Sequence, residues 1–453
     1  MQLTPNALSW LSLILKERFG HTFVLHHTDA GVVLSIPSQG EGQIIFPHTY
    51  PVFFESRSDI PFTTWDGEAE GWQCVLGEPL PAPGIAALPS PLIEVDSQAQ
   101  TAKVHYDILG LTYWMLNRIE EIGSTELDNH GRFPATSSHA YKHDYLERPI
   151  VDEWLNILGQ VAQQVWPNIE LKQHEFSMKV SHDVDSPSLY QFKPWQTIIR
   201  MMAGHLLKRR DIKAFLQAPY IKLSAGKRLH PQDPYNTFDW LMDVSEKNGL
   251  TSAFYFICGT TSNMDADYQP EEPAIRELIQ RIHQRGHEIG LHPSYGTYQT
   301  PQLIKQEANR LRAVMQKEGI EQDTLGGRMH YLRWQHPTTL QAWNDAGMTY
   351  DTTLSYADRP GFRCGTCFEY PAFNTITQQS LQIRIRPLIA MECTVIDGVY
   401  LGLGVTQAAE NKFLELKEKC RKLSGCFTTL WHNSYFHGSS ELKQMYKRII
   451  EIG

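Results

Sequence analysis

The chain has 453 residues, a formal net charge of -9 at pH 7 and seven cysteines. This length exceeds that of one average domain and predicts two or three folded units. The acidic balance argues against a nucleic-acid-binding protein, since such proteins present a basic surface, and the odd, scattered cysteines predict reduced thiols without a disulfide framework.

Residues 1–20 predict an amphipathic helix, because Leu8, Leu11 and Leu15 recur at helical spacing. No basic residue opens this segment, as one would in a signal peptide, and the chain contains no run of about 18 apolar residues. We therefore expect a cytoplasmic chain without a transmembrane segment.

Short alternating apolar runs at 32–36 and 43–46 predict a small α/β unit. A proline-rich stretch at 79–91 is typical of a linker or an extended loop and favours a domain boundary. Helical spacing returns over 106–122 and again over 151–166, with an aromatic and histidine-rich loop between these two segments.

From residue 176 onward, predicted strands and helices alternate. Strands are predicted at 177–182, 251–258, 287–291, 325–330, 348–351, 381–389 and 425–431, and helices at 236–249, 271–285, 301–318, 337–346, 407–422 and 439–450. Repeated β/α units of this kind indicate a parallel sheet or barrel. We therefore expect a small α/β domain over 1–100, a helical and loop segment over 101–170, and a (β/α) barrel over 171–453.

An insertion at 194–228 separates the first two of these strands. Its apolar residues, among them Ile199, Leu206 and Leu207, face a basic set that includes Lys208 and Arg209. A helix of this type can lie on a membrane surface, or it can pack as a helical pair on the domain with a solvated charged face.

Polar side chains stand where the predicted strands end. They are Asp183, Asp185, His292, Arg328, His330 and His432. An Asp-x-Asp pair alone is often only a polar turn, and a lone histidine is often structural. Several such clusters at successive strand ends are different, because loops at the C-terminal face of α/β barrels assemble active sites.

This set has the chemistry of a hydrolytic site. Carboxylate and imidazole ligands suit a borderline divalent cation, most of all Zn²⁺, which polarises a carbonyl and acidifies a bound water. A second aspartate can then accept a proton, and a remaining histidine can protonate the leaving group.

At these residues the chain resembles the polysaccharide deacetylase family, carbohydrate esterase family 4, over roughly residues 171–453. The motifs that carry the resemblance are Ser181-His182-Asp183-Val184-Asp185, Gly286-His287-Glu288-Ile289-Gly290-Leu291-His292, Arg328-Met329-His330-Tyr331 and Leu430-Trp431-His432. The resemblance implies a distorted (β/α) barrel. It also indicates a bacterial subgroup with an uncharacterised N-terminal domain, to which residues 1–170 would correspond.

The resemblance assigns a role to each motif residue. It implies that Asp183 is the catalytic base, that Arg328 orients this base, and that His432 is the general acid. Asp185 and His292 would be metal ligands, and Asp358 would polarise His432.

One motif departs from the family pattern. The second histidine of the family's metal motif would stand at position 296, which is Gly296 in this chain. We expect His330, which replaces a proline of the third motif, to supply the missing ligand.

The expected function is the metal-dependent removal of an N-acetyl group from a sugar, which is a polysaccharide or a lipid- or nucleotide-linked sugar of bacterial surface-glycan metabolism. Aromatic residues near the motifs could stack on the sugar, namely Tyr295, Tyr331, Trp334 and Trp431. Two alternatives stay open: hydrolysis of a non-sugar amide at the same site, and a non-catalytic domain that binds carbohydrate or protein. A lipid-linked substrate would place the protein peripherally at the inner membrane surface and would give the basic insertion a task.

Overall fold

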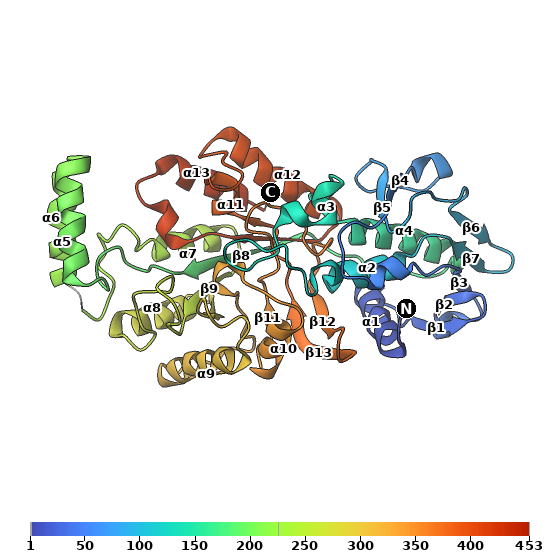
Figure 1. Ribbon diagram of the computed structural model, residues 1–453, viewed down its shortest axis with the longest axis horizontal. Helices are drawn as coiled ribbons and strands as arrows, with labels where there is room; N and C mark the ends of the chain where they lie inside the picture. The colour runs from blue at the N-terminus through green and yellow to red at the C-terminus, as the bar shows by residue number, and fades with distance from the viewer. Residues whose placement is uncertain (1, 225, 453) are drawn as a thin grey trace.

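The computed structural model describes residues 2–224 and 226–452, so the parts of the predicted segments that fall on Met1, Ala225 and Gly453 lie outside the described residues. The fold is mixed α/β with several sheets. Figure 1 shows an elongated molecule with the N-terminal elements at one end, the later strands and helices in the middle, and helices α5 and α6 at the opposite end.

The first 170 residues contain two sheets and four α-helices. A five-stranded sheet has the order β1-β2-β3-β7-β6, β4 pairs with β5, and helix α4 contacts both sheets. The elements are α1 (Pro5–Phe19), β1 (Val24–Thr28), β2 (Gly31–Ser35), β3 (Gln43–Phe46), β4 (Phe62–Trp65), β5 (Leu80–Pro83), β6 (Ile93–Asp96), β7 (Thr101–Val104), α2 (Ile108–Leu116), α3 (His139–Lys142) and α4 (Ile150–Val165).

Helix α1 confirms the predicted N-terminal helix and shows why it begins and ends where it does. The Thr4 side chain accepts a hydrogen bond from the Ala7 backbone N–H, and Pro5 occupies the first turn, where its missing N–H has no cost. Gly20 closes the helix with a φ of 82°, which favours glycine. The helix predicted over 106–122 is shorter: α2 ends at Leu116, because Arg118 adopts a left-handed φ of 51°.

The second half is built on parallel strands. One sheet has the order β10-β9-β8-β15-β14 with parallel pairing throughout, and a smaller sheet has the order β11-β13-β12. The strands are β8 (Ser177–Val184), β9 (Ser252–Ile257), β10 (Glu288–His292), β11 (Tyr350–Asp351), β12 (Tyr370–Asn374), β13 (Gln379–Ile385), β14 (Ala390–Met391) and β15 (Cys426–Leu430).

The helices of this half are α5 (Trp195–Gly204), α6 (Ile212–Leu223), α7 (Phe238–Lys247), α8 (Pro273–Gln284), α9 (Pro301–Lys317), α10 (Thr338–Asp345), α11 (Glu392–Ile396), α12 (Gln407–Lys422) and α13 (Ser440–Ile450). Six of them, α7, α8, α9, α10, α12 and α13, lie close to their predicted positions, α5 and α6 fall in the predicted insertion, and α11 was not predicted. A turn of π-helix, His205–Arg209, extends α5.

The strand predicted at 325–330 is wrong. Only Gly327 pairs in this segment, through single parallel bridges to Leu291 and Asp351. The backbones are so close there that a Cβ atom on Gly327 would lie 1.8 Å from the Leu291 carbonyl oxygen. The chain then turns through left-handed φ values at Tyr331 and Leu332, 61° and 55°, which end the extended conformation.

The predicted barrel is not confirmed, because no closed sheet occurs among the described residues. The segment between β13 and β14 nevertheless bonds to both sheets. The Arg386 N–H donates to the Asp351 carbonyl of β11, and the Ile389 N–H donates to the Thr428 carbonyl of β15.

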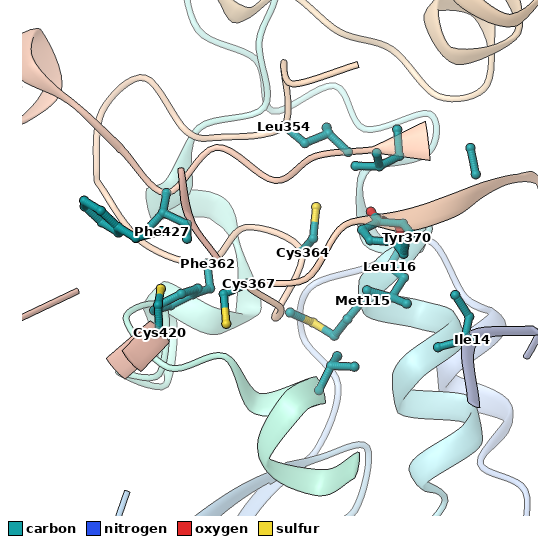
Figure 2. Packing of buried hydrophobic residues seen from close by; sticks show 14 of the residues in the cluster. Ile14, Met115, Leu116, Leu354, Phe362, Cys364, Cys367, Tyr370, Cys420 and Phe427 are labelled. Carbon is teal, nitrogen blue, oxygen red and sulfur yellow. Dashed lines mark hydrogen bonds between the residues drawn. The ribbon is translucent and has the colours of Figure 1, made fainter. Parts of the chain in front are cut away.

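One hydrophobic core runs through both halves of the chain. Figure 2 shows Ile14 of α1 and Met115 of α2 beside Cys364 and Tyr370 of the second half. The Trp10 indole N–H, also from α1, donates to the Pro371 carbonyl, and its ring packs on Phe373. The first 170 residues therefore pack tightly against the β/α part.

Among the described residues, no helix is both long and apolar enough to cross a bilayer. The insertion predicted at 194–228 contains helices α5 and α6, which pack on each other.

Candidate metal centre

The polar residues predicted at the strand ends lie at one edge of the sheet. Asp183 belongs to β8, His292 is the last residue of β10, and His432 follows β15 by two residues. These strands are parallel neighbours or are joined through β9, so their C-terminal ends face the same side. Arg328 and His330 join them from the segment after the Gly327 bridge.

Asp185, His292 and His330 form a group with metal-ligand geometry. One ligand atom from each lies within 4.8 Å of the others. The His292 Nε2 atom is 3.2 Å from Asp185 Oδ1, and the His330 Nε2 atom is 3.7 Å from Asp185 Oδ2. Both histidines are buried, and Asp185 is half-buried. Position 296, where the family motif has a histidine, instead donates its backbone N–H to the Thr261 hydroxyl.

In both His292 and His330, the ring nitrogen Nδ1 is hydrogen-bonded to an acceptor. His292 Nδ1 lies 2.6 Å from the Arg328 carbonyl, and His330 Nδ1 lies 3.1 Å from Asp265 Oδ1. Because a carbonyl and a carboxylate only accept, each Nδ1 carries the hydrogen. In the neutral imidazole the lone pair is then on Nε2, which faces Asp185.

Two buried atoms of this group lack hydrogen-bond partners in the described part of the chain, namely Asp185 Oδ1 and His292 Nε2. A buried carboxylate oxygen facing a bare imidazole lone pair is unfavourable unless something positive lies between them. Two imidazoles and one carboxylate are the three protein ligands that Zn²⁺ has in many catalytic sites, with the fourth position left for water or substrate. The residues therefore fit a divalent cation.

The electrostatics of His330 depend on two carboxylates. Burial disfavours its charged form, but Asp185 and Asp265 raise the pKa of His330 to about 9. Asp265 is itself buried, yet the hydrogen bonds from His330 and from the backbone N–H groups of Tyr295 and Thr261 lower its pKa to about 2. A cation that binds His330 must therefore displace a proton, and metal affinity will fall at acidic pH.

Asp183 and Arg328 form a buried pair beside this group. Arg328 Nη1 donates to Asp183 Oδ1 over 2.7 Å, and Nη2 donates to the Ser181 hydroxyl over 2.8 Å. The Arg328 Nε–H donates to the Thr352 carbonyl, so the guanidinium is fixed on three sides. The second oxygen of Asp183 lies 3.7 Å from His292 Nε2 and faces the centre.

His432 is the third histidine that approaches the Asp185 carboxylate. Its Nε2 atom is 3.5 Å from Asp185 Oδ2, and its Nδ1 atom is 2.5 Å from Glu392 Oε1. Burial disfavours the imidazolium, but the Glu392 carboxylate outweighs it and raises the pKa of His432 to about 10. The expected partner Asp358 is elsewhere: its Oδ1 accepts a hydrogen bond from the Ala135 N–H.

Two of the four expected aromatic residues lie at the centre. The Tyr331 ring is 4.8 Å from the His330 ring and 5.3 Å from the Tyr295 ring, and both tyrosines are partly exposed. Neither of the two expected tryptophans presents an exposed ring at the centre. Trp334 is buried, and Trp431 is fully buried in the core, where it stacks on Phe413.

Asp265 and Glu392 were not among the sequence candidates. Glu392 comes three residues after the strand predicted at 381–389, and Asp265 comes seven residues after the strand predicted at 251–258. Both are acids that follow predicted strands, which is the signal that could have found them.

Comparisons with known proteins add little to this geometry. Residues 2–167 match a family of unknown function, DUF7033. No curated protein sequence is significantly similar to the chain. A crystal structure described as that of a "putative polysaccharide deacetylase from Mycobacterium smegmatis" is similar to it with a TM-score of 0.38 and 14% identity, over 62% of this chain and 86% of that chain. Similarity of this size establishes no activity, and the proposal below depends on the centre itself.

Proposed function

We propose that this chain is a metal-dependent hydrolase that removes an N-acetyl group from a sugar. The observation that carries the proposal is the unpartnered pair Asp185 Oδ1 and His292 Nε2, 3.2 Å apart and flanked by a fixed carboxylate and a fixed imidazole. In this proposal Asp185, His292 and His330 hold a divalent cation, and Zn²⁺ matches these ligands best. When bound, the cation supplies Lewis acidity that polarises the amide carbonyl and acidifies a water molecule.

Asp183 is the proposed base. Its Oδ1 atom is occupied by the Arg328 guanidinium, which leaves Oδ2 to accept a proton from a water at the centre. Arg328 keeps the carboxylate oriented and is a positioning residue, since each of its three nitrogens already donates to Asp183, Ser181 or Thr352.

His432 is the proposed acid. Glu392 holds its Nδ1 atom, so that Nε2 points to the centre and can give a proton to the departing amine. Base and acid thus both face the group around Asp185, where an amide would bind for cleavage.

The substrate class rests on the surroundings and on the motif resemblance. Tyr295 and Tyr331 present partly exposed rings beside His330, and such rings can pack on the apolar face of a sugar. The four motifs resemble those of a family that acts on N-acetylated carbohydrate, and we therefore propose such a substrate in bacterial surface-glycan metabolism, with a non-sugar amide as the alternative.

The proposal extends to the fold and the domains. Backbone hydrogen bonds from Arg386 to Asp351 of β11 and from Ile389 to Thr428 of β15 support a distorted (β/α) barrel, in which 386–391 bridges the two open sheets. We further propose that 1–100 and 101–170 act as a scaffold for this barrel over 171–453.

The metal content of the purified protein tests the proposal. Elemental analysis after gel filtration should find about one equivalent of a divalent ion in the wild type and much less in His292→Ala and His330→Ala. Wild-type protein loaded with Zn²⁺ should release acetate from N-acetyl sugars. Absence of a bound ion after reconstitution would contradict the proposal and favour a non-catalytic carbohydrate- or protein-binding domain.

Asp183→Asn separates binding from proton transfer. Since it removes only the base, turnover should fall at least about 100-fold while the metal content stays at the wild-type level. Unchanged turnover in this variant would remove Asp183 from the mechanism.

A further inference from the structure

Helices α5 and α6 form a hairpin, called here the α5–α6 hairpin and comprising residues 194–228. Its two helices bury one face against each other, through Ile198 of α5 and Ala218 and Ile221 of α6. Figure 1 shows the hairpin standing at the end of the molecule away from the N-terminal elements.

Helix α6 carries a second apolar stripe that faces solvent. Its members follow one another at intervals of four, four and three residues, which places them on one helix face: Ile212, Leu216, Tyr220 and Leu223. Each is more than half exposed, and Leu223 is 74% exposed. This stripe lies on a different face from Ala218 and Ile221, so the helix is apolar on both sides.

Helix α5 and its π-helical extension repeat this pattern. Trp195, Ile199 and Leu206 are exposed, and the neighbouring Leu207 is 76% exposed. Large apolar side chains are common singly on protein surfaces, but eight of them on one 35-residue hairpin are not.

The charge of the hairpin is opposite to that of the rest of the chain. Residues 194–228 contain eight lysines and arginines and one acid, Asp211, while the whole chain has a net charge of -9. Four of the cations, Lys208, Arg209, Arg210 and Lys213, lie at the turn between the two helices and are exposed.

We propose that the α5–α6 hairpin docks the protein on an anionic membrane surface. Apolar side chains that enter the acyl boundary together with cations that meet anionic headgroups are the two features of interfacial helices. Trp195 and Tyr220 have the amphipathic rings that favour the headgroup level. Cations alone would also attract nucleic acid, but exposed leucines and isoleucines contribute nothing to phosphate binding, so the combination favours a lipid surface.

The hairpin is joined directly to the candidate metal centre. Helix α5 begins ten residues after Asp185, on the chain that leaves the C-terminal end of β8. This end of the sheet carries the centre, so a docked hairpin holds the centre near the bilayer. If the proposed deacetylase function also holds, on which this step rests, the substrate is an N-acetyl sugar carried on a lipid.

Vesicle flotation with the full chain tests the docking. Wild-type protein should float with vesicles of 30% phosphatidylglycerol in phosphatidylcholine, and much less with pure phosphatidylcholine or at high salt. Leu207→Glu with Leu216→Glu, and separately Lys208→Ala with Arg209→Ala and Arg210→Ala, should each lower the partition coefficient at least about 10-fold. Val399→Glu, at an 86% exposed position outside the hairpin, is the matched control and should float like the wild type.

Three outcomes would overturn the inference. They are failure of the wild type to float with anionic vesicles, flotation that the hairpin variants leave unchanged, and a wild-type dimer on gel filtration that the same variants dissociate without any vesicle binding. Acetate release from a water-soluble N-acetyl sugar distinguishes failure of the membrane-docking proposal from failure of the proposed deacetylase function. Hairpin variants should retain this release, whereas failure of the proposed function abolishes it in the wild type as well.

Discussion

The imidazoles around Asp185 are held alike, although their holders come from three separate segments. His292 is held by the Arg328 carbonyl, His330 by Asp265, and His432 by Glu392. In each case a hydrogen bond at Nδ1 fixes the ring and leaves Nε2 for the centre. Residues that do not touch the centre therefore decide its geometry.

Asp265→Asn should weaken metal binding about 10-fold, because the amide no longer provides the negative charge that strengthens His330 as a ligand. Competition with a chelator measures this affinity. Asp267→Asn is the matched control, since the Asp267 carboxylate is paired with Lys193 away from the centre. Equal affinity in the two variants would show that Asp265 has no part in the centre.

Glu392→Gln should lower kcat about 10- to 100-fold and leave the metal content unchanged, because His432 loses the carboxylate that stabilises its protonated form. Asp358→Asn makes the same chemical change at the position first expected to act, and kcat should stay within about twofold of the wild type. If an acetate-release assay instead showed a larger loss of kcat in Asp358→Asn than in Glu392→Gln, Asp358 would be the partner of His432.

At the scale of elements, the segment around Gly327 supplies Arg328 and His330 without forming a strand. Its backbone is hydrogen-bonded on both sides: Arg328 donates to the Leu291 carbonyl, and Thr352 donates to the Gly327 carbonyl. This close approach is possible only because Gly327 has no side chain.

Gly327→Ala should therefore lower the free energy of unfolding by about 3 kcal/mol or more and reduce metal content, since the strands on both sides must separate. Urea unfolding and elemental analysis measure the two effects. Gly204→Ala is the control, because a Cβ atom there meets open space and alanine is favoured in a helix. Equal stability of both variants would contradict this account.

The predictability of each element follows from how its residues are buried. Strands β8, β9, β10 and β15 and the long helices carry apolar periodicity over several residues, and the sequence predicted them closely. The segment 325–330 pairs only at Gly327 and lacks this apolar periodicity. The strand predicted there was therefore wrong. Asp265 and Glu392 follow predicted strands, but the histidines they contact could not be inferred, because the contacts with His330 and His432 span 65 and 40 positions of the chain. Asp183, Asp185, His292 and His432 were predicted because they lie at or just after the ends of strands in the sequence.

At the scale of the whole molecule, buried polar contacts join the two halves. Glu121 pairs with both Arg118 and Arg363 in a fully enclosed site, and the Arg118 guanidinium donates to the Tyr356 hydroxyl. Separation of the halves would leave these charges buried without partners or expose the shared core.

Calorimetry should accordingly show one cooperative unfolding transition, although chains of this length often show several. Its van't Hoff and calorimetric enthalpies should agree. Two resolved transitions would mean that residues 2–167 and the remainder unfold independently.

Stability should depend on pH through His139, which is buried in the first half. Its Nε2–H donates to the Ile60 carbonyl and its Nδ1 accepts from the Tyr145 hydroxyl, so the folded ring is neutral. Burial, with a smaller contribution from His143, lowers the pKa of His139 to about 3. Between pH 6.5 and 3 the unfolded chain binds a proton at His139 that the folded chain does not. The free energy of unfolding therefore falls by about 1.4 kcal/mol from this group for each unit by which the pH is lowered.

His139→Gln lacks this titration. The variant should be less stable than the wild type at pH 7, and the difference in unfolding free energy should narrow as the pH falls from 6 to 4. Urea unfolding at several pH values measures the difference, and a constant gap would contradict the neutral buried ring.

The opposite charges of the α5–α6 hairpin and the rest of the chain give the molecule a large electric dipole moment along its length. The hairpin carries +7 and the remainder -16, and the hairpin stands at one end. Near a charged surface, within about one Debye length of 8–10 Å, the field exerts a torque before any contact forms. A negatively charged surface therefore attracts the positively charged hairpin and repels the acidic remainder of the chain. The molecule approaches such a surface with the hairpin first.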